Sequence, residues 1–163
     1  MIRYSYFEGA PVGPLLMLAS ERGVAGLYMQ ADRQKPTLAS TQWRFDTSHF
    51  ENLCTQLDAY FAGTLRDFDI ELDLVGTPFQ LAVWQALRAI PYGTTISYGE
   101  LARRVGNPRA VRAVGLANGR NPVSIMVPCH RVIGANGALT GYGGGLDNKR
   151  LLLQIEAPRL PGW

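Results

Sequence analysis

The spacing of apolar residues changes near Gly76 and Thr77, and this change is the strongest constraint on the fold. Before it, short runs at residues 2–7, 15–20 and 24–29 alternate apolar and polar side chains between glycines and prolines. Such runs predict antiparallel strands. After it, helix-start signals follow one another closely. We therefore expect an α/β (α+β) protein with two domains, residues 1–76 and 77–163.

The first half also contains one helix signal and one further strand signal. Ser48 and Glu51 have the spacing of a capping box, and the helix that they predict ends near Gly63. Its apolar stripe consists of Phe50, Leu53, Cys54, Leu57, Tyr60 and Phe61. We interpret Cys54 in this stripe as a small core residue and not as a reactive thiol. The alternation over residues 68–74 predicts a half-exposed strand.

The second half opens with a strong helix start. Thr77 and Gln80 form a capping box around Pro78, which suits the first position of a helix. The face expected to be buried consists of Phe79, Ala82, Val83, Ala86, Leu87 and Ile90. Ser97 and Glu100 form another capping box and predict a short helix.

A second short helix is expected directly after this one. The first ends at Gly106, Asn107 can cap the next, and Pro108 can begin a helix that runs to about Asn118. Two short helices joined by a tight turn are typical of a helix-turn-helix, whose second helix enters a DNA groove. Arg109, Arg112, Ala113 and Leu116 lie on the outer side of this expected recognition helix.

Charge is divided unevenly between the two halves. Residues 1–76 carry 6 Lys and Arg against 10 Asp and Glu, a net −4, whereas residues 77–163 carry 10 against 3, a net +7. A basic half is typical of nucleic-acid binding, and solubility is the alternative explanation. No apolar run is long enough for a membrane span and the first residues lack the pattern of a signal peptide, so we expect a cytoplasmic protein without membrane contact.

One short segment combines groups for thiol chemistry. Cys129 precedes His130 and Arg131 between apolar residues. Neighbouring histidine or arginine lowers the pKa of a thiol, so this setting predicts some thiolate near neutral pH. Adjacent residues on a strand point to opposite faces, so the pair acts together only where the chain turns or through a bridging water. The sequence leaves both arrangements open.

Glu156 is a candidate partner for His130. It lies three and four residues after Leu153 and Leu152 on the expected C-terminal helix, so its carboxylate shares the apolar face. An inward carboxylate needs a hydrogen-bonding partner and can orient His130. The alternative is that Glu156 points to water at a fraying helix end.

These features together resemble a known family. Residues 77–156 are similar to the C-terminal domain of the methylated-DNA protein-cysteine methyltransferases, also called alkylguanine-DNA alkyltransferases. The matching motifs are Asn121-Pro122, Pro128-Cys129-His130-Arg131-Val132, the helix with Arg112, Thr140-Gly141-Tyr142, and Glu156. The resemblance implies a C-terminal winged helix-turn-helix domain and an N-terminal ribonuclease-H-like supporting domain.

The resemblance also implies a function and a role for each matching residue. Cys129 would accept the alkyl group from oxygen 6 of a damaged guanine, or from an alkylated thymine, irreversibly and once per molecule. His130 would take the thiol proton through a water, and Glu156 would hold His130. Tyr98 would help to rotate the target and donate a hydrogen bond to the base. Arg112 would fill the gap in the base stack, with Arg109 and Ala113 beside it on the DNA. Asn121 would be the hinge to an active-site strand, and the base pocket would be lined by Tyr142, Gly143 and Val132.

Further expectations concern cofactors, metals and partners. Some family members hold a structural zinc in the N-terminal domain, but this half has only Cys54 and His49, so we expect no metal, and no cofactor. The expected partner is double-stranded DNA with an alkylated guanine, bound by a monomer that can cluster along the DNA. Three other functions stay open: a sensor of alkylated DNA that transfers nothing, a winged-helix regulator, and a thiol hydrolase.

Overall fold

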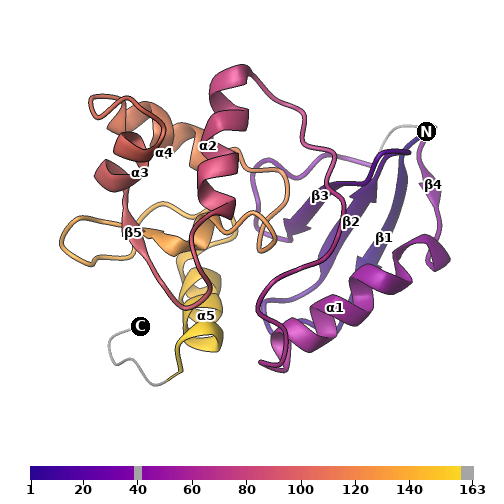
Figure 1. Ribbon diagram of the computed structural model, residues 1–163. Coiled ribbons are helices and arrows are strands. Elements are labelled where there is room, and N and C mark those ends of the chain that lie inside the picture. The colour runs from indigo at the N-terminus through magenta and orange to yellow at the C-terminus, as the bar shows by residue number, and fades with distance from the viewer. Residues whose placement is uncertain (39–41, 159–163) are drawn as a thin grey trace.

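The structure is a computed structural model that describes residues 1–38 and 42–158 (Figure 1). The N-terminal elements are β1 (Arg3–Phe7), β2 (Leu15–Ala19), β3 (Val24–Met29), β4 (Arg44–Phe45) and α1 (Glu51–Phe61). The strands form one sheet in the order β3-β2-β1-β4, in which β1, β2 and β3 are antiparallel and β4 is parallel to β1. The three expected strands and the expected helix are confirmed.

The start of α1 differs from the sequence-based prediction. A short 3-10 turn, η1 (Ser48–Phe50), precedes α1. Ser48 does not cap the helix: its hydroxyl donates to a carboxylate oxygen of Asp46 at 2.8 Å, and the backbone N–H of His49 donates to the same oxygen at 3.3 Å. The predicted capping box of Ser48 and Glu51 is therefore wrong, because the charged Asp46 is the stronger local acceptor.

The segment at residues 68–74 is only partly a strand. Its alternate side chains are half-buried against the core, as predicted. Pairing is limited to one parallel bridge between Leu72 and Val24 of β3. The reason is that two segments share the outer edge of β3: Leu72 pairs with Val24, and Val123 of the second half pairs with Leu27 further along the strand. The predicted strand therefore shrinks to a single bridge.

The C-terminal elements follow a linker after residue 74. They are α2 (Pro78–Arg88), β5 (Ile96–Ser97), α3 (Tyr98–Arg104), α4 (Val111–Gly119), the 3-10 turn η2 (Cys129–Arg131), β6 (Val132–Ile133) and α5 (Leu146–Glu156). β5 and β6 form a small parallel sheet. The capping box of Thr77 and Gln80 is confirmed, with reciprocal bonds of 3.1 and 3.0 Å. The last five residues of the expected domain lie outside the described residues.

The buried face of α2 is rotated from the predicted one. Val83, Trp84 and Leu87 are buried, whereas Phe79 is 37% exposed and Ala82 is exposed. The indole N–H of Trp84 donates to the carbonyl of Ala117 in α4 at 2.9 Å. This bond and the large apolar area of the indole draw Trp84 inward, and the helix turns with it.

The helix-turn-helix is present, with a longer turn than predicted. The hydroxyl of Ser97 accepts the N–H of Glu100 at 3.0 Å, but the carboxylate of Glu100 bonds arginines of α3, so only half of that capping box forms. α4 begins at Val111 and not at Pro108. Residues 107–110 form a turn in which the N–H of Ala110 donates to the carbonyl of Asn107 at 3.0 Å.

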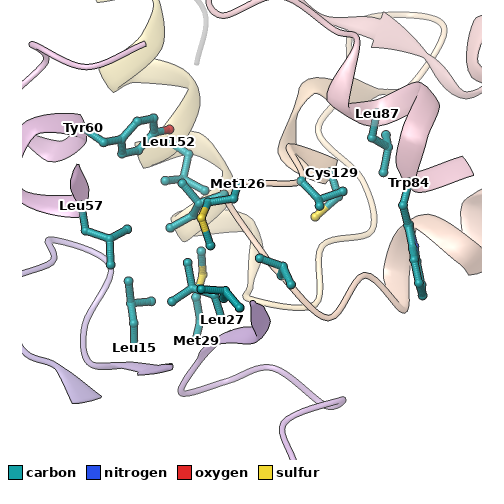
Figure 2. Close-up of a cluster of buried hydrophobic side chains, with 14 of the residues drawn as sticks. Leu15, Leu27, Met29, Leu57, Tyr60, Trp84, Leu87, Met126, Cys129 and Leu152 are labelled. Carbon is teal, nitrogen blue, oxygen red and sulfur yellow. The ribbon is translucent and has the colours of Figure 1, made fainter. Parts of the chain in front are cut away.

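One hydrophobic core joins the two halves. Figure 2 shows Leu57 and Tyr60 of α1 on one side and Trp84 and Leu87 of α2 on the other, with Met126 between them. All five side chains belong to one cluster of buried residues. The core therefore holds the N-terminal domain against the segment that precedes Cys129. None of the helices in residues 1–38 and 42–158 is long and apolar enough to cross a membrane.

Candidate active site

Cys129 lies at a turn of the backbone, not on a strand. Pro128 has φ −81° and ψ 65°, and the N–H of Cys129 donates to the carbonyl of Val127 at 2.8 Å, which together define a tight inverse γ-turn. The N–H of Arg131 then donates to the carbonyl of Pro128 at 3.0 Å and closes η2. The predicted active-site strand is wrong, because proline fixes φ and the chain turns there. The backbone therefore turns at Cys129 and His130.

Asn121 holds the approach to this turn. Its amide nitrogen donates to the carbonyl of Val127 at 2.7 Å, and its amide oxygen accepts the N–H of Val123 at 2.9 Å. Between these contacts Ile125 has φ 75°, a left-handed conformation that is strained for a β-branched residue. The N–H of Ser124 donates to Leu27 of β3 at 3.0 Å, so the N-terminal sheet braces the strained segment.

His130 and Glu156 form a buried pair. The side chains are 0% and 1% exposed, and Nε2 of His130 lies 2.7 Å from Oε2 of Glu156. Burial raises the pKa of Glu156, but the contacts with His130 and Arg131 outweigh burial and hold it well below its usual value. The carboxylate is ionised, so Nε2 carries the proton that it donates. The expectation that Glu156 faces His130 is confirmed in geometry, and the alternative that it points to water is wrong.

The second nitrogen of His130 is free to accept a proton. Nδ1 is buried and has no hydrogen-bond partner in the described structure. Burial lowers the pKa of His130 and outweighs the opposing effect of Glu156, so the imidazole is neutral and Nδ1 carries a lone pair. A buried lone pair without a partner is costly unless a reaction uses it. His130 therefore offers the free acceptor that a general base needs, one residue after Cys129 in η2.

Two residues that the sequence analysis did not link to Glu156 complete its set of hydrogen-bond donors. Arg131 donates from Nε to Oε1 at 2.7 Å and from Nη2 to Oε2 at 3.0 Å, and its Nη1 donates to the carbonyl of Ile90 at 2.7 Å. The hydroxyl of Tyr60, from α1, donates to Oε2 at 2.6 Å. Tyr60 looked like one more member of an apolar stripe, and no sequence signal linked it to a glutamate 96 positions away.

The resting thiol of Cys129 is neutral. Burial raises its pKa to about 11, although Asn121 and Lys149 act in the opposite direction. The prediction of thiolate near neutral pH is therefore wrong. Its premise fails because the guanidinium of Arg131 is held by Glu156 and Ile90, and because the neighbouring His130 is neutral. A base must therefore take up the thiol proton in the course of the reaction.

Lys149 is a further residue that the sequence did not indicate. It is fully buried on α5, and its Nζ donates to the carbonyls of Val132 at 2.6 Å and Thr140 at 2.8 Å. Burial lowers its pKa to about 8, while the nearby Cys129 acts in the opposite direction. Lys149 thus ties β6 to the loop before Tyr142 and places a positive charge where a developing thiolate gains from it.

Two of the three expected base-pocket residues, Tyr142 and Gly143, lie beside Cys129. Tyr142 and Gly143 line a narrow cavity with Cys129 and Asn121, and they also line an open cleft of about 560 Å³ with Tyr98. That volume is ample for a nucleobase. The hydroxyl of Tyr142 is buried without a hydrogen-bond partner among the described residues.

Other polar groups mark the same place. Asn118 of α4 lines the narrow cavity and its Oδ1 is buried without a described partner, a feature that the sequence did not single out. The hydroxyl of Tyr98 donates to the carbonyl of Thr140 at 3.1 Å, which places Tyr98 against the pocket loop. Val132 is fully buried in β6, where its carbonyl accepts Lys149.

The outer face of α4 is open and basic. Arg112, Ala113 and Leu116 are exposed on this helix, as predicted. Arg109 is exposed too, but it lies in the turn before α4 and not on the helix, because α4 starts three residues later than expected. Neither arginine forms an ion pair within the described part of the chain. An exposed recognition helix with unpaired arginines suits contact with a phosphate backbone.

The fold and site together define a class: a DNA-binding domain that carries a buried thiol, a histidine and a glutamate, supported by a separate N-terminal domain. Family models agree. Residues 78–158 match the DNA-binding domain of 6-O-methylguanine DNA methyltransferase, and residues 2–74 match its ribonuclease-like domain. The chain therefore belongs to the 6-O-methylguanine DNA methyltransferase family.

Individual relatives agree with this assignment. The chain is 52% identical over 161 residues to the methylated-DNA–protein-cysteine methyltransferase of Mycobacterium tuberculosis, covering 99% of this chain and 96% of that one. It is 50% identical over 153 residues to the protein of that name from Methanosarcina acetivorans, covering 94% and 97%. A crystal structure of M. tuberculosis OGT in complex with DNA matches with a TM-score of 0.88 at 51% identity, covering 98% and 96%. The two-domain fold expected from the sequence is confirmed.

Proposed function

We propose that Cys129 is the acceptor thiol of a DNA repair methyltransferase that removes alkyl groups from oxygen 6 of guanine. A bond forms between Sγ and the alkyl carbon while the bond from that carbon to the guanine oxygen breaks. The thiol proton passes to Nδ1 of His130, directly or through a water. The leaving guanine takes up one proton, so the products are a thioether and a normal base.

One observation carries the proposal: the nitrogen of His130 that does not face Glu156 is a buried acceptor without a partner, in the residue next to a buried thiol. The carboxylate of Glu156 stabilises the imidazolium that forms. The neutral resting thiol fits a substrate that reacts only in this pocket, because a neutral thiol is a poor nucleophile toward other electrophiles.

The DNA side of the proposal rests on α4 and the cleft. An enzyme that reacts with a stacked base must extrude it, at a cost of a few kcal/mol. Arg112 fills the gap in the stack, with Arg109 and Ala113 at the backbone, and Tyr98 helps to rotate the target and donates to the base. The base enters between Tyr142, Gly143 and Val132. Alkylated thymine is a further substrate of the same pocket.

The same proposal includes the organisation of the chain. The domain boundary lies after Gly76, and Asn121 is the hinge that joins the helix-turn-helix to the reactive turn. The protein acts as a monomer on double-stranded DNA with an alkylated guanine, and copies cluster along the DNA. It works in the cytoplasm, and it needs no metal or cofactor.

The test compares two cysteine variants. The wild-type protein and Cys54→Ser should each gain the mass of one methyl group when mixed with a duplex that contains one O6-methylguanine. Cys129→Ser should gain none and should still bind the duplex, because a hydroxyl has nearly the same size but is a far weaker nucleophile. Intact-mass spectrometry reads the result. Methyl uptake by folded Cys129→Ser, or its loss in folded Cys54→Ser, would contradict the assignment.

A second measurement separates this function from a thiol hydrolase. A thioether has no good leaving group, so product should stop at one equivalent per protein with alkylated DNA in excess. Steady product formation beyond one equivalent would indicate a hydrolase. Binding without any gain of mass in the wild-type protein would indicate a sensor or a regulator.

A further inference from the structure

We propose that Tyr60, from the N-terminal domain, is a positioning residue for alkyl transfer: its hydroxyl fixes the carboxylate of Glu156 and thereby sets the orientation and basicity of His130. The inference rests on the proposed function. It assigns to the supporting domain a part in the reaction at Cys129, exerted through Glu156 and His130.

The contacts of one oxygen atom carry the argument. Oε2 of Glu156 accepts the hydroxyl of Tyr60 at 2.6 Å, Nε2 of His130 at 2.7 Å and Nη2 of Arg131 at 3.0 Å. Tyr60 and His130 are both 0% exposed, so no bulk water can replace either donor. Three donors share the negative charge of this oxygen, so each hydrogen bond weakens the electrostatic attraction between the oxygen and the other two donors.

Position follows from the same contacts. Arg131 contacts both oxygens from one side, Oε1 at 2.7 Å and Oε2 at 3.0 Å, and Tyr60 adds a shorter contact of 2.6 Å to Oε2 from the opposite domain. A carboxylate fixed at both oxygens cannot rotate, so the imidazole that donates to it is held in one plane. Nδ1 of His130 then keeps one orientation, and small losses of alignment at such a group slow a reaction strongly.

Basicity follows from the shared charge. The charged and titratable groups around the pair are Tyr60, Tyr92, Arg131 and Lys149. Without the hydroxyl of Tyr60, Oε2 offers more of its charge to His130 and stabilises the imidazolium more strongly. The pKa of His130 then rises, and the acid side of the rate profile moves to higher pH because His130 must be neutral to act as the base.

The neighbouring Tyr92 provides a matched control. Its ring meets that of Tyr60 edge-on at 6.3 Å, and its hydroxyl donates to the carbonyl of Ile155 at 3.3 Å. Tyr92→Phe therefore removes a hydroxyl bonded to the end of the same helix, with no hydrogen bond to Glu156 in the described structure. Tyr60→Phe removes the hydroxyl bonded to the carboxylate itself and keeps the ring in the core.

The experiment uses the full chain and a methylated duplex in single-turnover reactions from pH 5 to pH 9. The amplitude counts active molecules and the rate constant reports the chemistry of each one, so partial unfolding and slower reaction are read separately. We expect Tyr60→Phe to lower the rate constant about tenfold and to raise the midpoint of the acid limb by about half a pH unit. Tyr92→Phe should match the wild-type protein in both.

Three results would overturn the inference: an unchanged rate constant in Tyr60→Phe, a lower amplitude alone, or a lower rate constant with an unmoved midpoint. An equal effect of Tyr92→Phe would do the same, because it would indicate a general requirement for packing. Uptake of one methyl group by the wild-type protein is measured first. The proposed function therefore stands or falls separately from the role of Tyr60.

Discussion

Replacing Glu156 with glutamine is expected to destabilise the protein much more than its single-atom change suggests. The carboxylate is the anionic partner of Arg131, whose side chain is only 7% exposed. Glutamine has nearly the same shape, but it carries no charge and it presents N–H donors to neighbours that are themselves donors. The variant therefore leaves a buried guanidinium without a counter-charge.

The size of the effect follows from this geometry. Removing one partner of a buried, hydrogen-bonded ion pair costs about 3–5 kcal/mol. For a chain of this length, 1 kcal/mol corresponds to about 2–4 °C in Tm, so Tm should fall by about 6–20 °C. Arg131 keeps only its bond to the carbonyl of Ile90 and one bond to the glutamine oxygen, which cannot make up the difference.

A double variant separates stability from chemistry. Combining Glu156→Gln with Arg131→Met removes the orphaned charge, and we expect it to recover about 2 kcal/mol or more of the lost stability. The rate constant for alkyl transfer should stay low, about a hundredfold below wild type, because His130 still lacks its anionic partner. Thermal unfolding and single-turnover alkyl transfer measure the two quantities.

Two outcomes would refute this reasoning. A fall in Tm of less than about 2 °C in Glu156→Gln would mean that the pair contributes no more than a surface ion pair. A double variant as unstable as the single one would mean that the lost stability does not come from an uncompensated guanidinium.

Two further predictions concern DNA and pH. Arg112→Ala should slow transfer from duplex about tenfold and should change transfer from the free alkylated base little. Arg88→Ala on α2 is the control. Equal losses on both substrates would contradict the role of Arg112 in filling the gap in the base stack. The folded-state pKa of Cys129 is raised to about 11 from 9.0, so its stabilising contribution is complete below pH 9 and is lost toward pH 11. Between these values denaturant titrations should show wild type losing about 2.7 kcal/mol more than Cys129→Ser; equal losses would show a thiol without a raised pKa.

Sequence predicted the fold well where the determining contacts are local. Thr77 and Gln80 are three residues apart and bond each other as the spacing predicts. Trp84 shows the limit: helical periodicity placed it off the buried face, but a carbonyl of α4 and the space between the helices bring it inward. Packing between distant segments decides which side chains of a helix are buried, and the sequence pattern of one helix does not show that packing.

The site divides in the same way. Cys129, His130 and Glu156 were found because a nucleophile, a base and an orienting carboxylate form a recognisable set. Tyr60 was missed because its hydroxyl meets Glu156 only after both domains have folded. The ionisation of Cys129 was misjudged because a linear sequence shows neighbouring charges but not burial, and burial dominates here.

The shared outer edge of β3 has a consequence for how the chain is made. The backbone of Val24 bonds the carbonyl of Glu71 and the N–H of Asp73. The backbone of Leu27 bonds the carbonyl of Pro122 and the N–H of Ser124, which are synthesised about a hundred residues later. Until those residues leave the ribosome, half of this edge presents unpaired backbone groups next to apolar side chains, a template for pairing with another chain. The nascent N-terminal domain is therefore most vulnerable to aggregation before the reactive turn is synthesised. The segment that leads into this turn also pairs with the free part of the β3 edge, so the active site and the sheet are completed together.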